Sequence, residues 1–267
     1  MESLLRRKLA QMPALKLFVK IFIDLLKGDL YQSKNSLSGC IATLKCDIQL
    51  SLNNQKSVKC NICDWQGNKF FPHVNSARVA LEQKCPQCHS IPRYRTLMKF
   101  LSDDIDFFNK KLSVLEIGPN CCLQNRLLKH PNFDYISIDL KSPQAMMHMN
   151  VTDLKFEDNR FDFILCVSVM QYVDDDVKGF GELYRVLKHG GRLIFASGID
   201  EKSDKTIEYS KRLVENCFTT RLYGRDVVKK MENVGFKVKE YKPYNSCSEF
   251  DKKRFGLSNT TIFLLEK

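Results

Sequence analysis

Four cysteines stand in two pairs, Cys60 with Cys63 and Cys85 with Cys88, and two residues separate the members of each pair. Between the two pairs lie 21 residues. This spacing is typical of a zinc ribbon, because each pair presents two thiolates to one side of a tetrahedral ion. Four cysteines leave no coordination position open for water, so we predict a structural zinc ion rather than a catalytic one. A redox site or a metal-free cluster is the alternative.

A second group of residues predicts a nucleoside pocket. The apolar run Ser113–Ile117 reads as a buried parallel strand that ends at Gly118, where the absence of a Cβ lets the backbone approach a ligand closely. Asp139 closes the next strand, Tyr135–Ile138, 21 positions after Gly118. In doubly wound folds an acid at that point reaches both hydroxyls of a ribose. These two strand ends predict a site for an adenosine-bearing cofactor.

The turn after the first of these strands distinguishes between adenosine cofactors. A dinucleotide needs a glycine-rich turn, because backbone N–H groups must cradle its pyrophosphate. The turn Gly118–Leu123 contains one glycine where the dinucleotide fingerprint has three. S-adenosylmethionine carries no phosphate, and its cationic amino group and sulfonium suit an acid such as Glu116. The sequence therefore favours the methyl donor over NAD.

With these features the chain resembles the class I S-adenosylmethionine-dependent methyltransferases, of the methyltransferase type 11 kind. Further blocks in the expected order are Asn150–Leu154, Arg160–Cys166, Val169–Val173 and Glu182–Leu193. The resemblance implies that the backbone around Gly118 takes the methionine end, that Asp139 takes the ribose and that Asp153 accepts from the adenine amino group. The cofactor-binding residues that it implies are Glu116, Ile117, Gly118, Pro119, Asp139, Leu140, Asp153, Leu154 and Cys166.

The acceptor side departs from the family pattern. Tyr172 stands where relatives often carry histidine, so a histidine base cannot be carried over. Tyr172 is our candidate catalytic residue, and Tyr172 and Tyr223 are the candidates for positioning the acceptor. No Asn/Asp-Pro-Pro-Tyr/Phe run follows the fourth strand, which weakens the case for an amino-group target such as adenine or glutamine.

The element pattern predicts a Rossmann-like, seven-stranded and mostly parallel sheet with helices on both faces. The resemblance adds that the last strand runs antiparallel beside the fifth. Strands are predicted at 112–117, 134–139, 146–149, 161–167, 191–197, 236–241 and 260–265. Helices are predicted at 92–107, 121–129, 176–188, 206–215 and 224–233.

Four segments are expected along the chain: an amphipathic helix at 1–28, a linker at 29–58, the zinc ribbon at 59–91 and the methyltransferase domain at 92–267. Methyltransferases with a cysteine ribbon ahead of the cofactor domain are similar in this respect. Within the first segment the polar residues Lys16, Lys20 and Asp24 form one stripe on an apolar cylinder. Such a helix either packs on its own domain or on a second copy, or it lies in an acidic membrane interface.

Charge and cysteine usage limit the partners and the compartment. Residues 1–100 hold 16 Lys and Arg against 6 Asp and Glu, a net charge of +10, whereas the other 167 residues hold 26 against 25. The excess points to an anionic partner, such as RNA or an acidic membrane surface, or simply to solubility. We see no secretory signal and no apolar run long enough to span a membrane, so the eleven cysteines are expected to be reduced or metal-bound in the cytoplasm, with membrane association as the alternative.

Three functions remain open. The first is a methyltransferase that acts on a small-molecule, glycan or lipid-linked acceptor. The second is an RNA methyltransferase whose basic ribbon holds the phosphate backbone. The third is a non-catalytic binding module that keeps the fold. Fold resemblance does not choose among acceptors, because function depends on the site.

Overall fold

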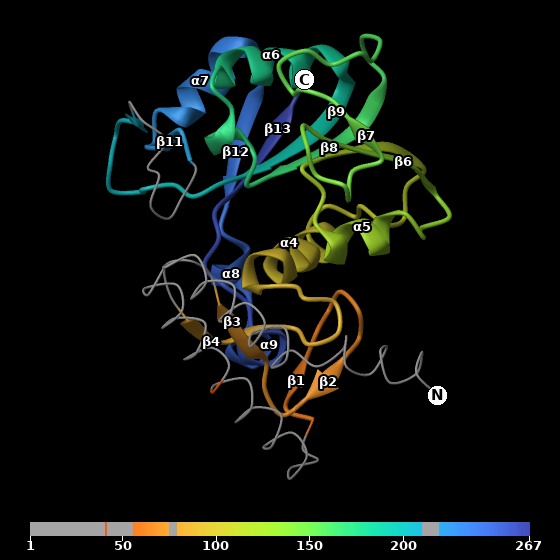
Figure 1. Cartoon of the computed structure of the whole chain (residues 1–267), viewed down its shortest axis with the longest axis vertical. Helices are drawn as coiled ribbons and strands as arrows, with labels where there is room; N and C mark the ends of the chain where they lie inside the picture. Colours follow the sequence, from red (N-terminus) through yellow and green to blue (C-terminus); the bar gives the residue numbers. More distant parts are fainter. Residues whose placement is uncertain (1–40, 42–55, 75–78, 210–218) are drawn as a thin grey trace, which may run out of the picture. The chain divides into compact units, whose positions relative to one another are not determined.

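The computed structural model describes residues 41, 56–74, 79–209 and 219–267 (Figure 1). The chain divides into two compact units. The ribbon unit contains the residues up to Arg95 together with Ser248–Leu257, and the sheet unit contains Thr96–Cys247 and Ser258–Lys267. The predicted helix at 1–28 lies outside the described residues, as does nearly all of the predicted linker. The predicted domain boundaries therefore stay predictions.

In the part of the ribbon unit that the structure describes, two short antiparallel hairpins pack with the helix α9 (Glu249–Phe255). Its core contains Phe70 and Phe71, both buried, with Trp65 packed 5.8 Å from Phe70 between ring centroids. The helix begins after Ser248, whose hydroxyl accepts from the Asp251 amide. The elements are β1 (Val58–Lys59) paired with β2 (Gln66–Gly67), β3 (Phe71–Val74) paired with β4 (Val79–Lys84), and α9 (Glu249–Phe255).

The sheet unit contains one seven-stranded sheet in the order β12-β13-β9-β8-β5-β6-β7. All neighbours pair in parallel except β13, which is antiparallel to both β12 and β9. The predicted Rossmann-like class and the reversed last strand are confirmed. The strands are β5 (Leu112–Ile117), β6 (Phe133–Asp139), β7 (Met147–His148), β8 (Phe161–Val167), β9 (Leu187–Ala196), β12 (Lys237–Tyr241) and β13 (Ile262–Glu266).

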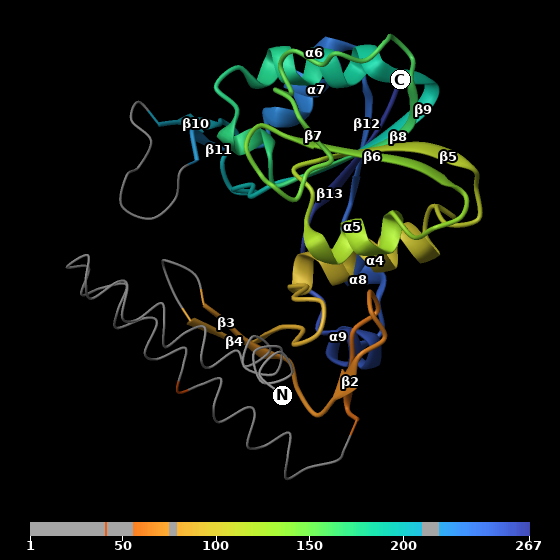
Figure 2. The ribbon, with the colours of Figure 1, turned by 45° about the vertical axis from the view of Figure 1, so that its right-hand side comes forward.

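Helices cover both faces of this sheet, as predicted (Figure 2). One face carries α4 (Pro92–Asp103) and α5 (Cys121–Leu127), and the other carries α6 (Asp176–Val186) and α7 (Val227–Val234). Shorter helical turns are η1 (Met170–Tyr172) and α8 (Pro243–Ser246). Among the described residues, no helix combines the length and the apolar character needed to cross a bilayer.

The main core lies between the sheet and the α6–α7 layer. Phe180, Leu183 and Val186 of α6 lie three residues apart, so they share one face of the helix, and all three are fully buried. Val227 and Met231 of α7 join the same cluster. Fully burying a side chain of this kind contributes roughly 1.5–3 kcal/mol, so the layer holds the strands beneath it firmly in register.

The predicted helix at 206–215 is wrong where the structure describes it. Ile207–Glu208 forms β10, which pairs antiparallel with β11 (Arg221–Leu222). The carboxylate of Glu208 accepts from the nearly buried guanidinium of Arg221, 3.0 Å from Nε to each oxygen. This long-range pair has no counterpart in the local sequence pattern. Residues 210–215 lie outside the described residues.

Candidate cofactor site and metal centre

The carboxyl ends of β5 and β6 bring Gly118 and Asp139 together. The Gly118 amide donates to the Ile138 carbonyl at 2.8 Å, and its φ of +63° is a left-handed conformation that favours glycine. A Cβ built on Gly118 would lie 2.5 Å from Val169 Cγ2 and 3.7 Å from Asp139 Oδ2. The bare backbone of Gly118 is thus required both by its conformation and by the contact with Val169.

Asp139 is held by the loop that follows it. Its Oδ1 accepts from the amides of Lys141 and Ser142, at 2.8 Å and 2.7 Å. Its Oδ2 accepts no hydrogen bond from the described residues, and it lies on the side of Gly118. One fixed and one available carboxylate oxygen at this edge fit the pair of hydroxyls on a ribose.

Glu116 lies beneath the same loop and is almost fully buried. Its Oε1 accepts from the Asn120 amide at 3.2 Å and its Oε2 from the Tyr135 hydroxyl at 2.5 Å. Burial raises the pKa of this carboxyl to about 7, although both hydrogen bonds act to lower it. Glu116 therefore fixes the loop between β5 and α5 from below, and Asn120 also begins α5 by accepting from the Cys122 amide.

The turn predicted to face adenine is connected to Asp139 through the backbone. The Met149 amide donates to the Asp139 carbonyl at 3.0 Å. Asp153, three residues into the Asn150–Leu154 block, is exposed and pairs with Lys155 Nζ at 2.6 Å. Leu154 is buried, and its amide donates to Glu182 Oε2 at 2.8 Å.

The remaining predicted residues differ in exposure. Ile117 and Pro119 are buried, and Leu140 is 58% exposed at the end of β6. Cys166 is fully buried in the core of the sheet unit, which raises the pKa of its thiol to about 12 and keeps it protonated. Tyr172 is half-exposed on η1, just after the carboxyl end of β8.

A residue that sequence reasoning did not single out clamps the loop carrying Tyr172. Arg221 is 4% exposed, and its guanidinium donates to the carbonyls of Met170 (3.0 Å), Val173 and Asp174 (2.9 Å). Asp176 Oδ2 lies 3.6 Å from Arg221 Nε and accepts from the Tyr223 hydroxyl at 3.0 Å. The loop that carries Tyr172 is therefore anchored on a buried charge network.

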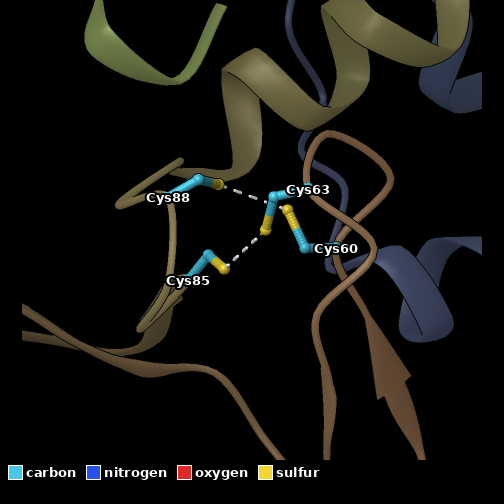
Figure 3. Close-up of side chains that lie close together, drawn as sticks. All are labelled: Cys60, Cys63, Cys85 and Cys88. Carbon is cyan, nitrogen blue, oxygen red and sulfur yellow. Dashed lines mark hydrogen bonds between the residues drawn. The ribbon is translucent and has the colours of Figure 1, made fainter. Parts of the chain in front are cut away.

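The two cysteine pairs of the ribbon unit meet at one point (Figure 3). The four Sγ atoms lie within 4.8 Å of one another, with 3.5 Å between Cys60 and Cys88 and 3.7 Å between Cys63 and Cys85. Four thiolates at about 2.3 Å from a tetrahedral zinc ion lie about 3.8 Å apart, so the arrangement fits Zn²⁺. Sequence spacing predicted all four residues.

The two pairs have the same local geometry. In the first, the Cys60 amide donates to Trp65 O and the Asp64 amide to Cys60 O; in the second, Cys85 donates to Ser90 O and His89 to Cys85 O. Asp64 and His89 occupy equivalent positions, with φ of 61° and 62°. Both turns thus direct their two sulfurs to the same side.

Because the four sulfurs lie close together, the pKa values of their thiols shift in different directions. Hydrogen bonds with the other three thiols lower the pKa of Cys60 and raise the pKa of Cys85. The pKa of Cys63 is also raised, chiefly by its hydrogen bond with Cys60. Four thiolates cannot share so small a volume without a cation. The donor set is therefore one that a divalent metal would complete.

The mostly parallel sheet with helices on both faces defines a Rossmann-like domain. Residues 115–195, from β5 into β9, match the family described as a methyltransferase domain. This part of the chain is therefore similar to a methyltransferase domain.

Curated relatives match over limited stretches. An uncharacterized protein of Methanocaldococcus jannaschii is 31% identical over 120 residues, which cover 39% of this chain and 53% of that protein. The Caenorhabditis elegans phosphoethanolamine N-methyltransferase 2 is 36% identical over 58 residues, which cover 21% of this chain and 13% of that protein. The chain spans about half the length of the first curated relatives that it matches.

Two solved structures match part of the chain. A methyltransferase from Burkholderia thailandensis that acts at N1 of 1,6-didemethyltoxoflavin, solved with S-adenosylhomocysteine, has a TM-score of 0.46 at 12% identity over 64% of this chain and 76% of that chain. A SAM-dependent methyltransferase from Archaeoglobus fulgidus has a TM-score of 0.44 at 14% identity over 62% of this chain and 91% of that chain.

Replacing Gly118 with alanine should destabilise the protein by roughly 1–3 kcal/mol, because the new Cβ meets Val169 and the left-handed backbone disfavours it. Chemical denaturation measures the change. Gly181 in α6 is the matched control: nothing lies within 4 Å of its Cβ position, so Gly181→Ala should stabilise by roughly 0.5–1 kcal/mol. A Gly118→Ala protein as stable as wild type would contradict the requirement for a bare backbone at position 118.

Stability should fall as the pH rises because of Glu116. Its folded pKa of about 7 lies above the ordinary 4.5, so the native state holds a proton that the unfolded state has lost. The contribution, about 3 kcal/mol, is complete below pH 4.5 and disappears as the pH passes 7. Denaturation at pH 5 and pH 8 should show a larger fall for wild type than for Glu116→Gln. An equal fall in stability for wild type and Glu116→Gln would contradict a buried, protonated Glu116 carboxyl.

Proposed function

We propose that this protein is an S-adenosylmethionine-dependent methyltransferase that binds its donor at the carboxyl edge of β5, β6 and β8. The observation that carries the proposal is the approach of Gly118 to Asp139, with one Asp139 oxygen fixed by backbone amides and the other available. The methyltransferase family match covers this same region of the sheet. When bound, the donor supplies a methyl group on a sulfonium, which is already a good leaving group.

Each residue at the edge then has a binding role. Asp139 would hold the ribose through Oδ2, and the backbone at Gly118 would make room for the methionine end. Glu116 acts through the loop that it fixes, by way of Asn120 and Tyr135. Holding two reacting groups in line can by itself lower the barrier by roughly 7–11 kcal/mol, so a rigid loop contributes directly to rate.

In this proposal Asp153 binds the adenine amino group only if it gives up its ion pair with Lys155. Its carboxylate pairs with Lys155 and is exposed, so a hydrogen bond to the adenine amino group would compete with that ion pair. An exposed pair of this kind contributes only about 0–1 kcal/mol, so exchanging it for a ligand contact costs little. Leu154, the buried neighbour of Asp153, would pack against the adenine ring.

The acceptor proposal is a small molecule, glycan or lipid-linked compound, positioned by Tyr172. The half-exposed ring of Tyr172 lies on a loop whose carbonyls Arg221 holds in place. RNA is less well supported, because Phe70 and Phe71 of the ribbon unit are buried and cannot offer faces for base stacking. The four-cysteine centre would hold Zn²⁺ as a structural ion.

Replacing Asp139 with asparagine should weaken S-adenosylhomocysteine binding about 100-fold by calorimetry, since hydrogen bonds to a charged group contribute about 1.5–3 kcal/mol each. Asparagine keeps an oxygen that can accept from Lys141 and Ser142, so the loop is retained. Asp134→Ala is the control, because Asp134 lies on the same strand, is exposed and pairs with Arg160. Wild-type affinity in Asp139→Asn would remove the site, and a wild-type chain without affinity would favour a non-catalytic module.

The acceptor class can be read by incubating the protein and tritiated S-adenosylmethionine with a cell extract. Label is expected in the small-molecule, glycan or lipid fraction, and Asp139→Asn protein should transfer none. Label confined to RNA would instead favour the nucleic-acid alternative.

A further inference from the structure

Arg95 is the largest fully buried side chain in the ribbon unit, and its guanidinium donates to backbone carbonyls from three separate segments. Nε donates to Phe255 O at 2.6 Å, and Nη2 donates to Gly256 O at 2.9 Å. Nη2 also donates to Gln83 O at 3.0 Å, and Nη1 donates to Ser90 O at 2.7 Å. One side chain thus joins β4, the second cysteine turn and the end of α9.

The end of α9 is shaped to this guanidinium. Arg95 Cζ lies 3.9 Å from the centroid of the Phe70 ring. Gly256 ends the helix with φ of +54°, and a Cβ there would lie 2.6 Å from the Phe70 ring and 3.0 Å from Arg95 Nη2. The Gly256 backbone therefore packs directly on the Arg95–Phe70 pair, where a larger residue does not fit.

Ser90 connects the guanidinium to the cysteine centre. Its Oγ lies 3.3 Å from Cys60 Sγ, 3.3 Å from Cys88 Sγ and 3.5 Å from Arg95 Nη1. Its carbonyl accepts from both the Cys85 amide and Arg95 Nη1. A single residue therefore touches three of the four cysteines and the arginine.

We propose that metal occupancy of the four-cysteine centre controls the attachment of Ser248–Leu257, with Ser90 and Arg95 as the positioning residues between them. Four thiolates around one Zn²⁺ carry a net charge of −2, which favours a buried guanidinium nearby. The bound ion fixes the second cysteine turn and so fixes the Ser90 carbonyl that Arg95 uses. Loss of the ion releases that turn. Arg95 is then no longer positioned to donate to the carbonyls of Phe255 and Gly256.

The segment concerned lies between β12 and β13 in the chain, so metal loss would free the connection between two strands of the sheet unit. This inference does not depend on the methyl-transfer proposal, because it concerns only the ribbon unit and its metal.

Hydrogen exchange on the full chain tests the proposal directly. Zinc-loaded protein and protein stripped with a chelator are compared by mass spectrometry of peptides. Peptides covering 248–257 should exchange at least about 10-fold faster after stripping, while peptides covering β5 stay unchanged. Equal exchange of 248–257 in both forms, or a chain that binds no zinc, would overturn the proposal.

Two variants separate the steps of the connection. Ser90→Ala keeps the carbonyl and removes the hydroxyl between Cys60 and Cys88, and it should release zinc about 10-fold faster, as loss of a group supporting a ligand commonly does. Arg95→Lys should raise exchange in 248–257 with zinc still bound. The control is Arg93→Lys, at an exposed position in the same helix. If Arg95→Lys behaves as this control does, the proposed connection is wrong.

Discussion

The hydrogen bond from the Gly118 amide to the Ile138 carbonyl is the contact on which the candidate site depends. It ends β5 one residue beyond the last parallel pair and turns the chain away over the edge of the sheet. Because β5, β6 and β8 run in parallel, their carboxyl ends meet at this edge, and Asp139 and Val169 arrive beside Gly118. Any side chain at position 118 would push Val169 away and disturb the whole edge.

The loop is held in this position by a carboxyl that the protein keeps buried. Burying an ionisable group costs free energy unless the group is paired or neutral. Two features of Glu116 offset that cost: it accepts hydrogen bonds from Asn120 and Tyr135, and it keeps its proton up to about neutral pH. The arrangement joins a strand of the sheet to a helix that covers it, since Tyr135 comes from β6 and Asn120 begins α5.

Local pattern was enough to predict the elements and the chemistry at their ends. The strands at 112–117 and 161–167 and the four cysteines follow from alternation and spacing, and an N-cap asparagine at 120 could have been found by the same means. The contacts that pattern could not supply are long-range. Arg95 meets Phe255 across 160 residues, and Arg221 reaches back to the loop at 170–174, because tertiary packing rather than periodicity selects these partners.

The split of the ribbon unit between two distant stretches of sequence has a consequence for how the nascent chain acquires its structure. The carbonyls of Phe255 and Gly256 are synthesised only after every strand from β5 to β12 has been synthesised. At ordinary translation speeds that interval is on the order of 10 s. During this interval the cysteine turns can already bind an ion. Arg95 cannot yet donate to Phe255 and Gly256, because those residues have not been synthesised. The order of synthesis thus places metal capture before closure of the ribbon.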